Sequence, residues 1–411
     1  RVVIATANIA LQEQLINKDL PLLAEVLPWK FTFALLKGRN NYLCRDRMHE
    51  SLARGDFVGL PDRARQQQAD AIVEWARSTR TGDESELPFV PAPQVWSHAS
   101  VGSDECKRKA CASYDDCFAE RAKARACAVD IVVTNYHMLF AHIAVRRETG
   151  EDLVLPPFDL LVCDEAHEAS EIARDFFGFA VSERTISLLA RRAKDLGGTA
   201  LAVSLRQRAG EFFSRLSAFA RSDDYRCRLR RAGFAEPTAL VKELAALAHF
   251  GDVVAGSQQR TPEDQVAGQV AARLARVAAA HITEAVALTD DNKVYWIELD
   301  QQRASLRAAP IDVSALLRKE MFDATASVTL VSATMTTGGT FDFLRGELGA
   351  PDGALEIVAA SPFDHRAQAL FVVPDEGLPD PRDDKFPVAV AGFVRRVIDA
   401  CERAKSRGEG A

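Results

Sequence analysis

The sequence predicts an α/β protein built on a parallel sheet, because short, continuously apolar runs alternate with helical patterns. Turn or cap signals bound these runs, which are VVIAT (2–6), DIVVTN (130–135), FDLLVCDE (158–165), SVTLVSAT (327–334) and ALFVVP (369–374). Strands that are buried on both faces of a parallel sheet need apolar residues at successive positions rather than at alternate ones. Helical patterns follow most of the runs, as is typical of α/β folds.

Two long stretches interrupt this alternation. About 90 residues, which include a cluster of cysteines, separate the first segments, and about 150 mostly helical residues lie between Asp164 and Ser332. A chain of 411 residues is also long enough for about three domains of ~150 residues each. We therefore expect one sheet domain that carries two insertions.

The second insertion, residues 171–322, is predicted to be helical with a β-hairpin near its end. Within TPEDQVAGQVAARLARVAAAHI, Thr261 can cap a helix whose first position is Pro262. One apolar stripe of this helix is expected to face the core: Val266, Val270, Leu274 and Val277. The alternating runs KVYWIEL and RASLRAAPI, joined through DQQ, predict the hairpin.

The composition is that of an ordinary globular protein, with 47% apolar and 27% charged residues. No apolar run approaches the roughly 18 residues that a membrane-spanning helix needs, so we expect no membrane protein. A net charge of −7 argues against a wholly basic coat for nucleic acid, although it says nothing of local patches. Three of the eight cysteines crowd into CKRKACASYDDC (106–117), which indicates metal binding in a reducing, cytoplasmic setting rather than disulfides.

The run LLVCDEAHEAS places two adjacent carboxylates, Asp164 and Glu165, at the end of a buried strand. The carboxyl ends of parallel strands face the ligand crevice of an open sheet. There, one carboxylate can hold Mg²⁺ while the next polarises the water that attacks a γ-phosphate. The alternative is an acidic helix N-terminus that only complements the helix dipole. A zinc protease motif is excluded, because position 171 holds Glu171 instead of the second histidine.

Four features together resemble superfamily 2 helicases of the DinG/XPD iron-sulfur type, most closely the bacterial DinG branch. They are TANIALQEQL (6–15), the cysteine array, DEAH (164–167) and VSATM (331–335), in the order of that family. The resemblance implies a RecA-like parallel-sheet motor domain with two insertions, an iron-sulfur domain and a helical Arch domain. It also implies an ATP-dependent DNA helicase, with 5′ to 3′ polarity and a monomeric state.

The resemblance divides the chain into six segments. They are the start of the first motor domain (1–37), the iron-sulfur cluster domain (38–127), the first motor domain with the DEAH motif (128–170), the helical Arch domain (171–322), the first motor domain with the SAT motif (323–360) and the start of the second motor domain (361–411).

The resemblance assigns the ATP and Mg²⁺ chemistry to two motifs. Asp164 would bind Mg²⁺ and Glu165 would activate the hydrolytic water. His167, together with Ser332 and Thr334, would couple the nucleotide state to movement on the strand.

A second set of residues corresponds to positions that the family uses against DNA: Thr6, Asn8 and Gln12 in the first motif, with Asn135 and His137 in TNYHML. Helix capping by Thr6 or Asn8 is an equally weighted alternative, because capping and phosphate contact both use short polar side chains. The partners implied are single-stranded DNA and DNA junctions or R-loops.

The resemblance also implies that Cys44, Cys106, Cys111 and Cys117 ligate a 4Fe-4S cluster. Such a cluster would clip together a domain with little core and give the translocating strand a fixed wall. A structural zinc ion or free thiols are the alternatives, and Cys127 could replace Cys44 as a ligand.

A basic stretch is a further candidate for the strand path. Residues 191–231 carry eleven basic side chains against four acids, giving +7, and an equally weighted alternative is a solvated helix face. The basic residues are Arg191, Arg192, Lys194, Arg206, Arg208, Arg215, Arg221, Arg226, Arg228, Arg230 and Arg231, and the acids are Asp195, Glu211, Asp223 and Asp224.

Some parts of the family pattern are absent from the sequence. No GxxxxGK(S/T) loop occurs, and the chain opens on RVVIAT without Met and ends in CERAKSRGEGA. We therefore expect a fragment of a longer ATPase. Rival hypotheses are an RNA or R-loop unwinding relative and a non-catalytic, metal-stapled module that binds single-stranded DNA.

Overall fold

The computed structural model describes residues 1–57, 62–103, 105–220, 226–300, 303–364, 368–374 and 377–406. The chain forms two compact units, residues Arg1–Ala354 and Leu355–Ala411, and each is described by itself. No helix in the described part of the chain combines the length and the apolarity that crossing a membrane requires.

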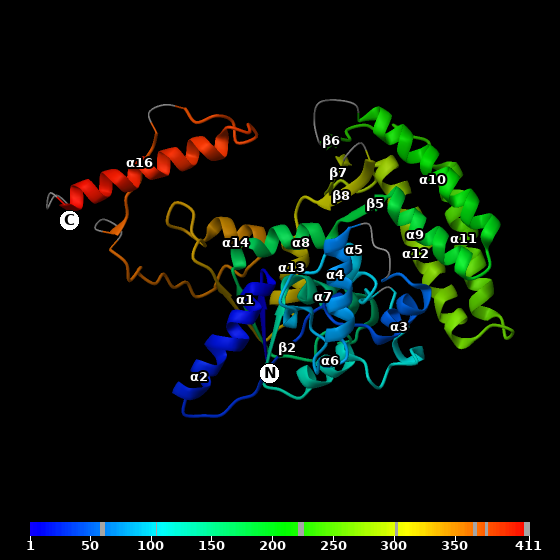
Figure 1. Cartoon of the computed structure of the whole chain (residues 1–411), viewed down its shortest axis with the longest axis horizontal. Helices are drawn as coiled ribbons and strands as arrows, with labels where there is room; N and C mark the ends of the chain where they lie inside the picture. Colours follow the sequence, from blue (N-terminus) through cyan, green and yellow to red (C-terminus); the bar gives the residue numbers. More distant parts are fainter. Residues whose placement is uncertain are drawn as a thin grey trace. The chain divides into compact units, whose positions relative to one another are not determined.

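A five-stranded parallel sheet organises the first unit (Figure 1). In spatial order its strands are β2 (Phe33–Leu35), β3 (Ile131–Asn135), β1 (Val2–Thr6), β4 (Leu160–Asp164) and β9 (Ser327–Val331). The prediction of an α/β protein with a parallel sheet is therefore confirmed. Val3, Val132 and Leu161 of the three central strands are at most 1% exposed, whereas Leu160 at the start of β4 is 43% exposed.

Two details of the predicted sheet differ from the structure. The run 369–374 is not a strand, and Leu370 and Phe371 in it are 70% and 92% exposed. An apolar run becomes a strand only when a neighbouring strand accepts its hydrogen bonds, and residues 368–374 pair with no described strand. In contrast, β2 is only three residues long and was not predicted.

Helices connect the strands of the first sheet. Between β1 and β2 lie α1 (Ile9–Gln14), the π-helix η1 (Leu15–Asp19) and α2 (Leu20–Val26). After β3 and β4 come α7 (Tyr136–Thr149), η5 (Ala166–Glu168) and α8 (Ala169–Phe177), and the helices around β9 are α13 (Ser314–Leu317), η6 (Arg318–Phe322) and α14 (Asp342–Leu348). The second unit contains α16 (Phe386–Ser406).

The stretch between β2 and β3, here called the cysteine segment (residues 38–127), consists of short helices. They are η2 (Arg39–Asn41), α3 (Arg45–Arg54), α4 (Arg63–Trp75), η3 (Glu84–Glu86), α5 (Pro93–Trp96), η4 (Arg108–Ala110) and α6 (Phe118–Cys127). Its buried residues, such as Ile72 and Phe118, belong to the same apolar cluster as Val3 and Val132 of the sheet. The core of this segment is therefore continuous with that of the sheet.

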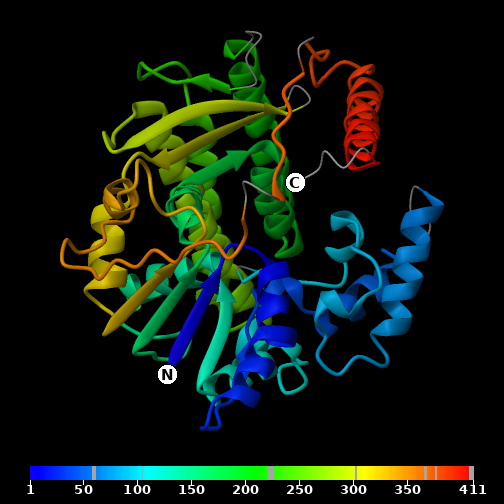
Figure 2. The ribbon, with the colours of Figure 1, turned by 90° about the vertical axis from the view of Figure 1, so that its left-hand side faces the viewer.

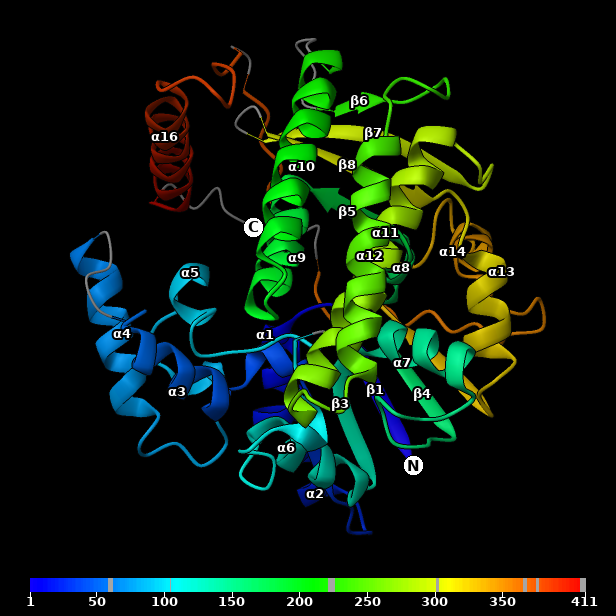
Figure 3. The same ribbon diagram turned by 90° about the vertical axis from the view of Figure 1, so that its right-hand side faces the viewer.

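The helical insertion (residues 171–322) contains a second, antiparallel sheet in the order β5-β8-β7-β6. Its strands are β5 (Phe179–Ser182), β8 (Arg303–Pro310), β7 (Lys293–Asp300) and β6 (Arg226–Arg228). The predicted hairpin is β7 with β8, whose connecting residues 301–302 lie outside the described residues. Helices α9 (Glu183–Asp195), α10 (Thr199–Phe219), α11 (Thr238–Gly256) and α12 (Pro262–Ala287) form a layer beside the sheet, in front of the strands in Figure 3.

The long helices α11 and α12 approach each other closely where two glycines face each other. A Cβ atom on Gly251 would lie 2.5 Å from the Gly268 carbonyl oxygen, and one on Gly268 would lie 2.7 Å from that of Gly251. Real Cβ atoms do not come so close to oxygen, so only glycine permits this backbone contact.

The start of α12 is as predicted, but its buried face is not. Thr261 caps the helix by accepting a hydrogen bond from the Asp264 N–H group (3.1 Å), and Pro262 opens it. The predicted stripe is only partly buried: Leu274 packs against the apolar cluster of the insertion, whereas Val277 is 42% exposed. The buried residues are Gly268, Ala271, Ala272, Ala275, Ala278, Ile282, Ala285 and Val286, because the close crossing admits mainly small side chains.

Candidate functional site

The parallel register brings the ends of four strands to one edge of the first sheet. Thr6 at the end of β1 lies opposite Asn135 of β3, and Asp164 of β4 lies opposite Val331 of β9. Residues that directly follow β4 and β9 must therefore meet at this edge.

Side chains from the DEAH and SAT runs form a triangle of close polar contacts there. The Nδ1 atom of His167 lies 2.7 Å from the Ser332 Oγ atom and 3.3 Å from the Glu165 Oε2 atom. The Ser332 hydroxyl donates to Glu165 Oε2 (3.2 Å) and accepts from the Thr334 N–H group (3.2 Å). The structure thus brings four of the five predicted catalytic residues into one network.

The fifth residue, Asp164, lies beside the triangle. Burial, followed by the neighbouring Glu165 carboxylate, raises the pKa of Asp164 above its usual range. Glu165 has a left-handed backbone (φ 51°, ψ 46°), a conformation that costs a non-glycine residue about 1–3 kcal/mol. The Tyr136 hydroxyl donates to the Asp164 carbonyl (2.8 Å) and braces this turn. Strain of this kind, held by its surroundings, is characteristic of functional sites.

The predicted DNA contacts in the first motif are only partly accessible. Thr6 and Gln12 are fully buried, and the Thr6 hydroxyl donates to the Asn8 carbonyl (3.0 Å). Asn8 is exposed and caps α1 by accepting from the Leu11 N–H group (3.1 Å), so the capping alternative is the arrangement observed for it. Both amide atoms of Gln12 are buried and have no hydrogen-bond partner among the described residues.

The two predicted DNA contacts at the end of β3 also differ in accessibility. Asn135 caps α7 by accepting from the Met138 N–H group (3.0 Å), whereas the side chain of His137 is exposed. Of these two residues, His137 is therefore the one available to a ligand at the sheet edge.

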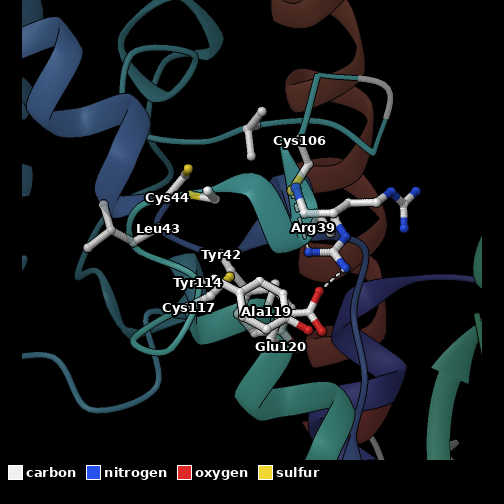
Figure 4. Close-up of a pocket in the computed structure, with 12 residues that line it drawn as sticks. Arg39, Tyr42, Leu43, Cys44, Cys106, Tyr114, Cys117, Ala119 and Glu120 are labelled. Atoms are coloured by element: carbon white, nitrogen blue, oxygen red, sulfur yellow. Dashed lines mark hydrogen bonds and ion pairs between the residues drawn. The ribbon is translucent and has the colours of Figure 1, made fainter. Parts of the chain in front are cut away.

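The four predicted cysteine ligands line a single pocket (Figure 4). Cys44 and Cys117 are the N-cap residues of α3 and α6, and Cys106 and Cys111 flank η4. No group of three or more His, Cys, Asp or Glu side chains in the described ranges is arranged closely enough to hold a metal ion. The pocket thus gathers the donor set without the closed geometry of a metal site.

The surroundings of these sulfur atoms nevertheless suit thiolate ligands. The backbone N–H groups of Arg47 and Arg108 donate to the sulfur atoms of Cys44 (3.5 Å) and Cys106 (3.4 Å). The Arg39 guanidinium also donates to the Cys106 sulfur (3.7 Å). Hydrogen bonds to cysteine sulfur and nearby positive charge stabilise the thiolates of iron-sulfur and zinc sites. Burial raises the pKa of Cys44 to about 11, so a bound cation would be needed to deprotonate it at neutral pH.

Ion pairs attach the residues on either side of Cys106 to the helices α3 and α9. Lys107 pairs with Asp46 of α3 (2.9 Å). Glu105 pairs with Arg47 of α3 (2.5 Å) and with Arg192 of α9 (3.3 Å). Glu105 therefore links the cysteine segment to the helical insertion.

One charged residue near the sheet edge was not identified from the sequence. Lys37 follows β2, its side chain is only 1% exposed, and it pairs with Asp83 (2.9 Å) and Glu13 (3.3 Å). A lysine directly after the apolar run FALL is the signal that could have identified this residue, because a buried ammonium group requires partners.

The predicted basic stretch spreads over α9, α10 and β6 instead of forming one helix face. Arg221, Asp223 and Asp224 lie outside the described residues.

Comparisons with known proteins identify relatives along nearly the whole chain, although no family model matches it. The chain is 33% identical over 406 residues to the ATP-dependent helicase DinG of Mycobacterium tuberculosis, covering 93% of this chain and 60% of that protein. It is 30% identical to the ATP-dependent DNA helicase YoaA of Escherichia coli, covering 97% of this chain and 63% of the relative. The 3′-5′ exonuclease DinG of Bacillus subtilis is 23% identical, with 96% and 47% covered.

A solved structure, that of S. tokodaii Xpd4, aligns with 82% of this chain and 55% of its own, at 12% identity. Its TM-score of 0.34 is too low to support any inference about the site.

The fold class is α/β, with a parallel sheet that carries carboxylate, imidazole and hydroxyl groups at one edge. The chain is a homologue of the relatives named ATP-dependent helicase DinG and ATP-dependent DNA helicase YoaA, and it spans about 60% of their length.

Proposed function

We propose that the chain forms part of an ATP-dependent DNA helicase of DinG type, which translocates 5′ to 3′ on single-stranded DNA. The observation that carries this proposal is the contact of His167 with Ser332 and Glu165 across the edge of the sheet. The relatives from Mycobacterium tuberculosis and Escherichia coli, both named ATP-dependent helicases, support it.

In this proposal the acidic pair handles the nucleotide. Asp164 would hold Mg²⁺, which supplies charge neutralisation at the phosphates of ATP when it is bound. Glu165 would orient and polarise the attacking water, with its carboxylate fixed by the Ser332 hydroxyl and the His167 ring. Because Ser332 follows β9 and His167 follows β4, a change at the carboxylate would be transmitted between these two strands.

The cysteine pocket would hold a 4Fe-4S cluster through Cys44, Cys106, Cys111 and Cys117. A cluster there would supply four covalent links between the start of α3 and the loops before α6, with zinc as the alternative. The donor set and the N–H groups aimed at two of its sulfur atoms support this assignment.

The remaining assignments follow the same proposal. Residues 38–127 would be the cluster domain, 171–322 the Arch domain, and the parts around the first sheet the motor domain, with a second motor domain from 361. The partners would be single-stranded DNA and DNA junctions or R-loops, bound by a monomer.

The proposal is tested in the full-length protein with Glu165→Gln and a matched control, Glu168→Gln. Glu168 is the more exposed carboxylate of the same turn and lies 3.8 Å from the His167 ring. Glu165→Gln should keep ATP binding and lose roughly 10²-fold or more of the DNA-stimulated turnover, as expected for a lost general base. Glu168→Gln should retain turnover.

Normal turnover by Glu165→Gln would contradict the assignment of the site. Unwinding of a duplex with a 3′ tail in preference to one with a 5′ tail would contradict the proposed polarity.

A further inference from the structure

The antiparallel sheet of the helical insertion has one face turned away from the helices α9–α12. Tyr295 and Ile297 of β7 and Leu306 of β8 are at most 3% exposed and pack in the apolar cluster with those helices. Successive side chains of a strand point to opposite faces. Trp296 and Arg307 therefore lie on the other face, here called the outer face, which is toward the viewer in Figure 2.

The register assembles basic side chains around the indole on the outer face. Trp296 lies directly opposite Arg228 of β6 on one side and Arg307 of β8 on the other. In the next row, Glu298 lies opposite Arg226. Directly opposed residues of antiparallel strands project to the same face, with Cβ atoms about 5 Å apart. The aromatic ring is thus flanked by Arg228 and Arg307, and Arg226 lies one row further along the same face.

The charges on this face are organised by one nearly buried carboxylate. Glu298, whose side chain is 9% exposed, pairs with Arg226 (3.1 Å) and Arg307 (2.5 Å). One acid therefore contacts the guanidinium groups of two arginines, whose side chains as a whole stay 66% and 41% exposed. Arg228 is exposed and has no ion pair with any residue in the described ranges. The face carries excess positive charge on a chain whose net charge is −7.

The indole itself has an unused donor. The Nε1 atom of Trp296 is buried and has no hydrogen-bond partner among the residues that the structure describes. A partly exposed ring beside oriented guanidinium groups matches the chemistry of single-stranded nucleic acid, in which bases stack on aromatic rings and phosphates pair with arginine.

We propose that the outer face binds single-stranded DNA, with Trp296 as the stacking surface for a base and Arg226, Arg228 and Arg307 as phosphate contacts. This inference rests on the proposed function and names a contact surface for its DNA. Charge complementarity and the row Arg228–Trp296–Arg307 carry it. It requires no residue of the nucleotide site.

The test measures binding of the intact chain to a fluorescent oligothymidylate by anisotropy, over a range of salt concentrations. Arg228→Gln should weaken binding several-fold and reduce the magnitude of the log–log salt slope by about 0.7, the value for one phosphate contact with a single strand. Trp296→Leu should weaken binding roughly 5- to 100-fold with little change in slope, because stacking releases no counterions.

The matched control is Lys242→Gln, which removes one exposed charge from the helical layer on the other side of the sheet. It should bind as the wild type does. Thermal unfolding of each variant separates lost binding from lost folding, and Arg228 is exposed enough that its variant should keep the wild-type midpoint.

Equal affinities for the wild type and both outer-face variants would overturn the inference. If the affinities are equal but the wild type binds DNA and its full-length form shows DNA-stimulated ATP turnover, only the outer face is excluded as a DNA contact and the proposed function stands. A wild type that binds no single-stranded DNA would also remove the proposed function. Tighter binding of the wild type to a double-stranded or RNA probe of equal length would exclude the assigned ligand.

Discussion

Substitution of Gly251 by alanine should destabilise the helical insertion, because the new methyl group enters the crossing of α11 with α12. The added Cβ atom would lie 2.5 Å from the Gly268 carbonyl oxygen and 2.9 Å from the Ala272 amide nitrogen. Both are backbone atoms, so relief requires a movement of the helix rather than of a side chain. Overpacking of this kind costs about 1–3 kcal/mol, occasionally more.

The helical preference of alanine opposes this cost, and a control can remove it from the comparison. Alanine is about 1 kcal/mol better than glycine inside a helix. Gly210 lies within α10, and a Cβ atom there would meet nothing closer than 3.8 Å, to a Glu183 carboxylate oxygen. Gly210→Ala should therefore stabilise the chain by up to about 1 kcal/mol, so the two variants should differ by about 1–3 kcal/mol from the clash alone.

Circular dichroism during thermal unfolding measures this difference. At about 2–4 °C for each kcal/mol in a domain of about 150–250 residues, the size of the helical insertion, the midpoint of Gly251→Ala should lie several degrees below that of Gly210→Ala. If Gly251→Ala raised the midpoint as much as Gly210→Ala does, the backbone contact at this crossing would be refuted.

Three further predictions concern the metal site, the acid stability and the link between segments. Cys44→Ser should lose the brown colour and the iron of protein purified without oxygen, whereas Cys127→Ser should keep both; a colourless wild type with one bound zinc ion would contradict the cluster. Burial lowers the pKa of His142 to about 4, so on acidification the unfolded chain binds a proton that the folded chain excludes. The free energy of unfolding therefore keeps the full contribution of this residue above pH ~6.5 and loses about 2 kcal/mol of it by pH 5. His142→Gln should flatten this pH dependence, measured by urea unfolding. Glu105→Gln should speed amide hydrogen exchange in α9 as the link to the helical insertion is lost, while Glu74→Gln, which removes an ion pair with Arg77 at the end of α4, should leave α9 unchanged.

The sequence predicted most of the first sheet because its strands are continuously apolar. The contact of Glu165 with Ser332 was not predicted, and it follows from the parallel pairing of β4 with β9, which ends both strands at one edge. It could not predict β2, which is too short to show a pattern. It also misassigned Phe371, because apolarity indicates a tendency to form a strand but cannot supply the neighbouring strand.

At the candidate site, the sequence showed which polar residues lie near the strand ends, but not which of them are accessible to a ligand. Asn8 follows β1 and Asn135 ends β3, as expected, yet both cap helices. The burial of Gln12 depends on tertiary packing that no local pattern encodes. Cys106, Cys111 and Cys117 were identified by their spacing, and Cys44 only through the resemblance to the helicase family. Their gathering in one pocket required the fold, because Cys44 is remote in sequence from the other three.

The connection between β4 and β9 has a consequence for the order in which the protein is made. These neighbouring strands are separated by about 160 residues of chain, which contain the whole helical insertion. At a synthesis rate of roughly 5–20 residues per second, β4 leaves the ribosome about 10–30 s before the strand that covers its edge. During that interval its backbone hydrogen-bonding groups on that side have no partner strand, so the nascent chain offers a site where a chaperone or a second nascent chain can bind.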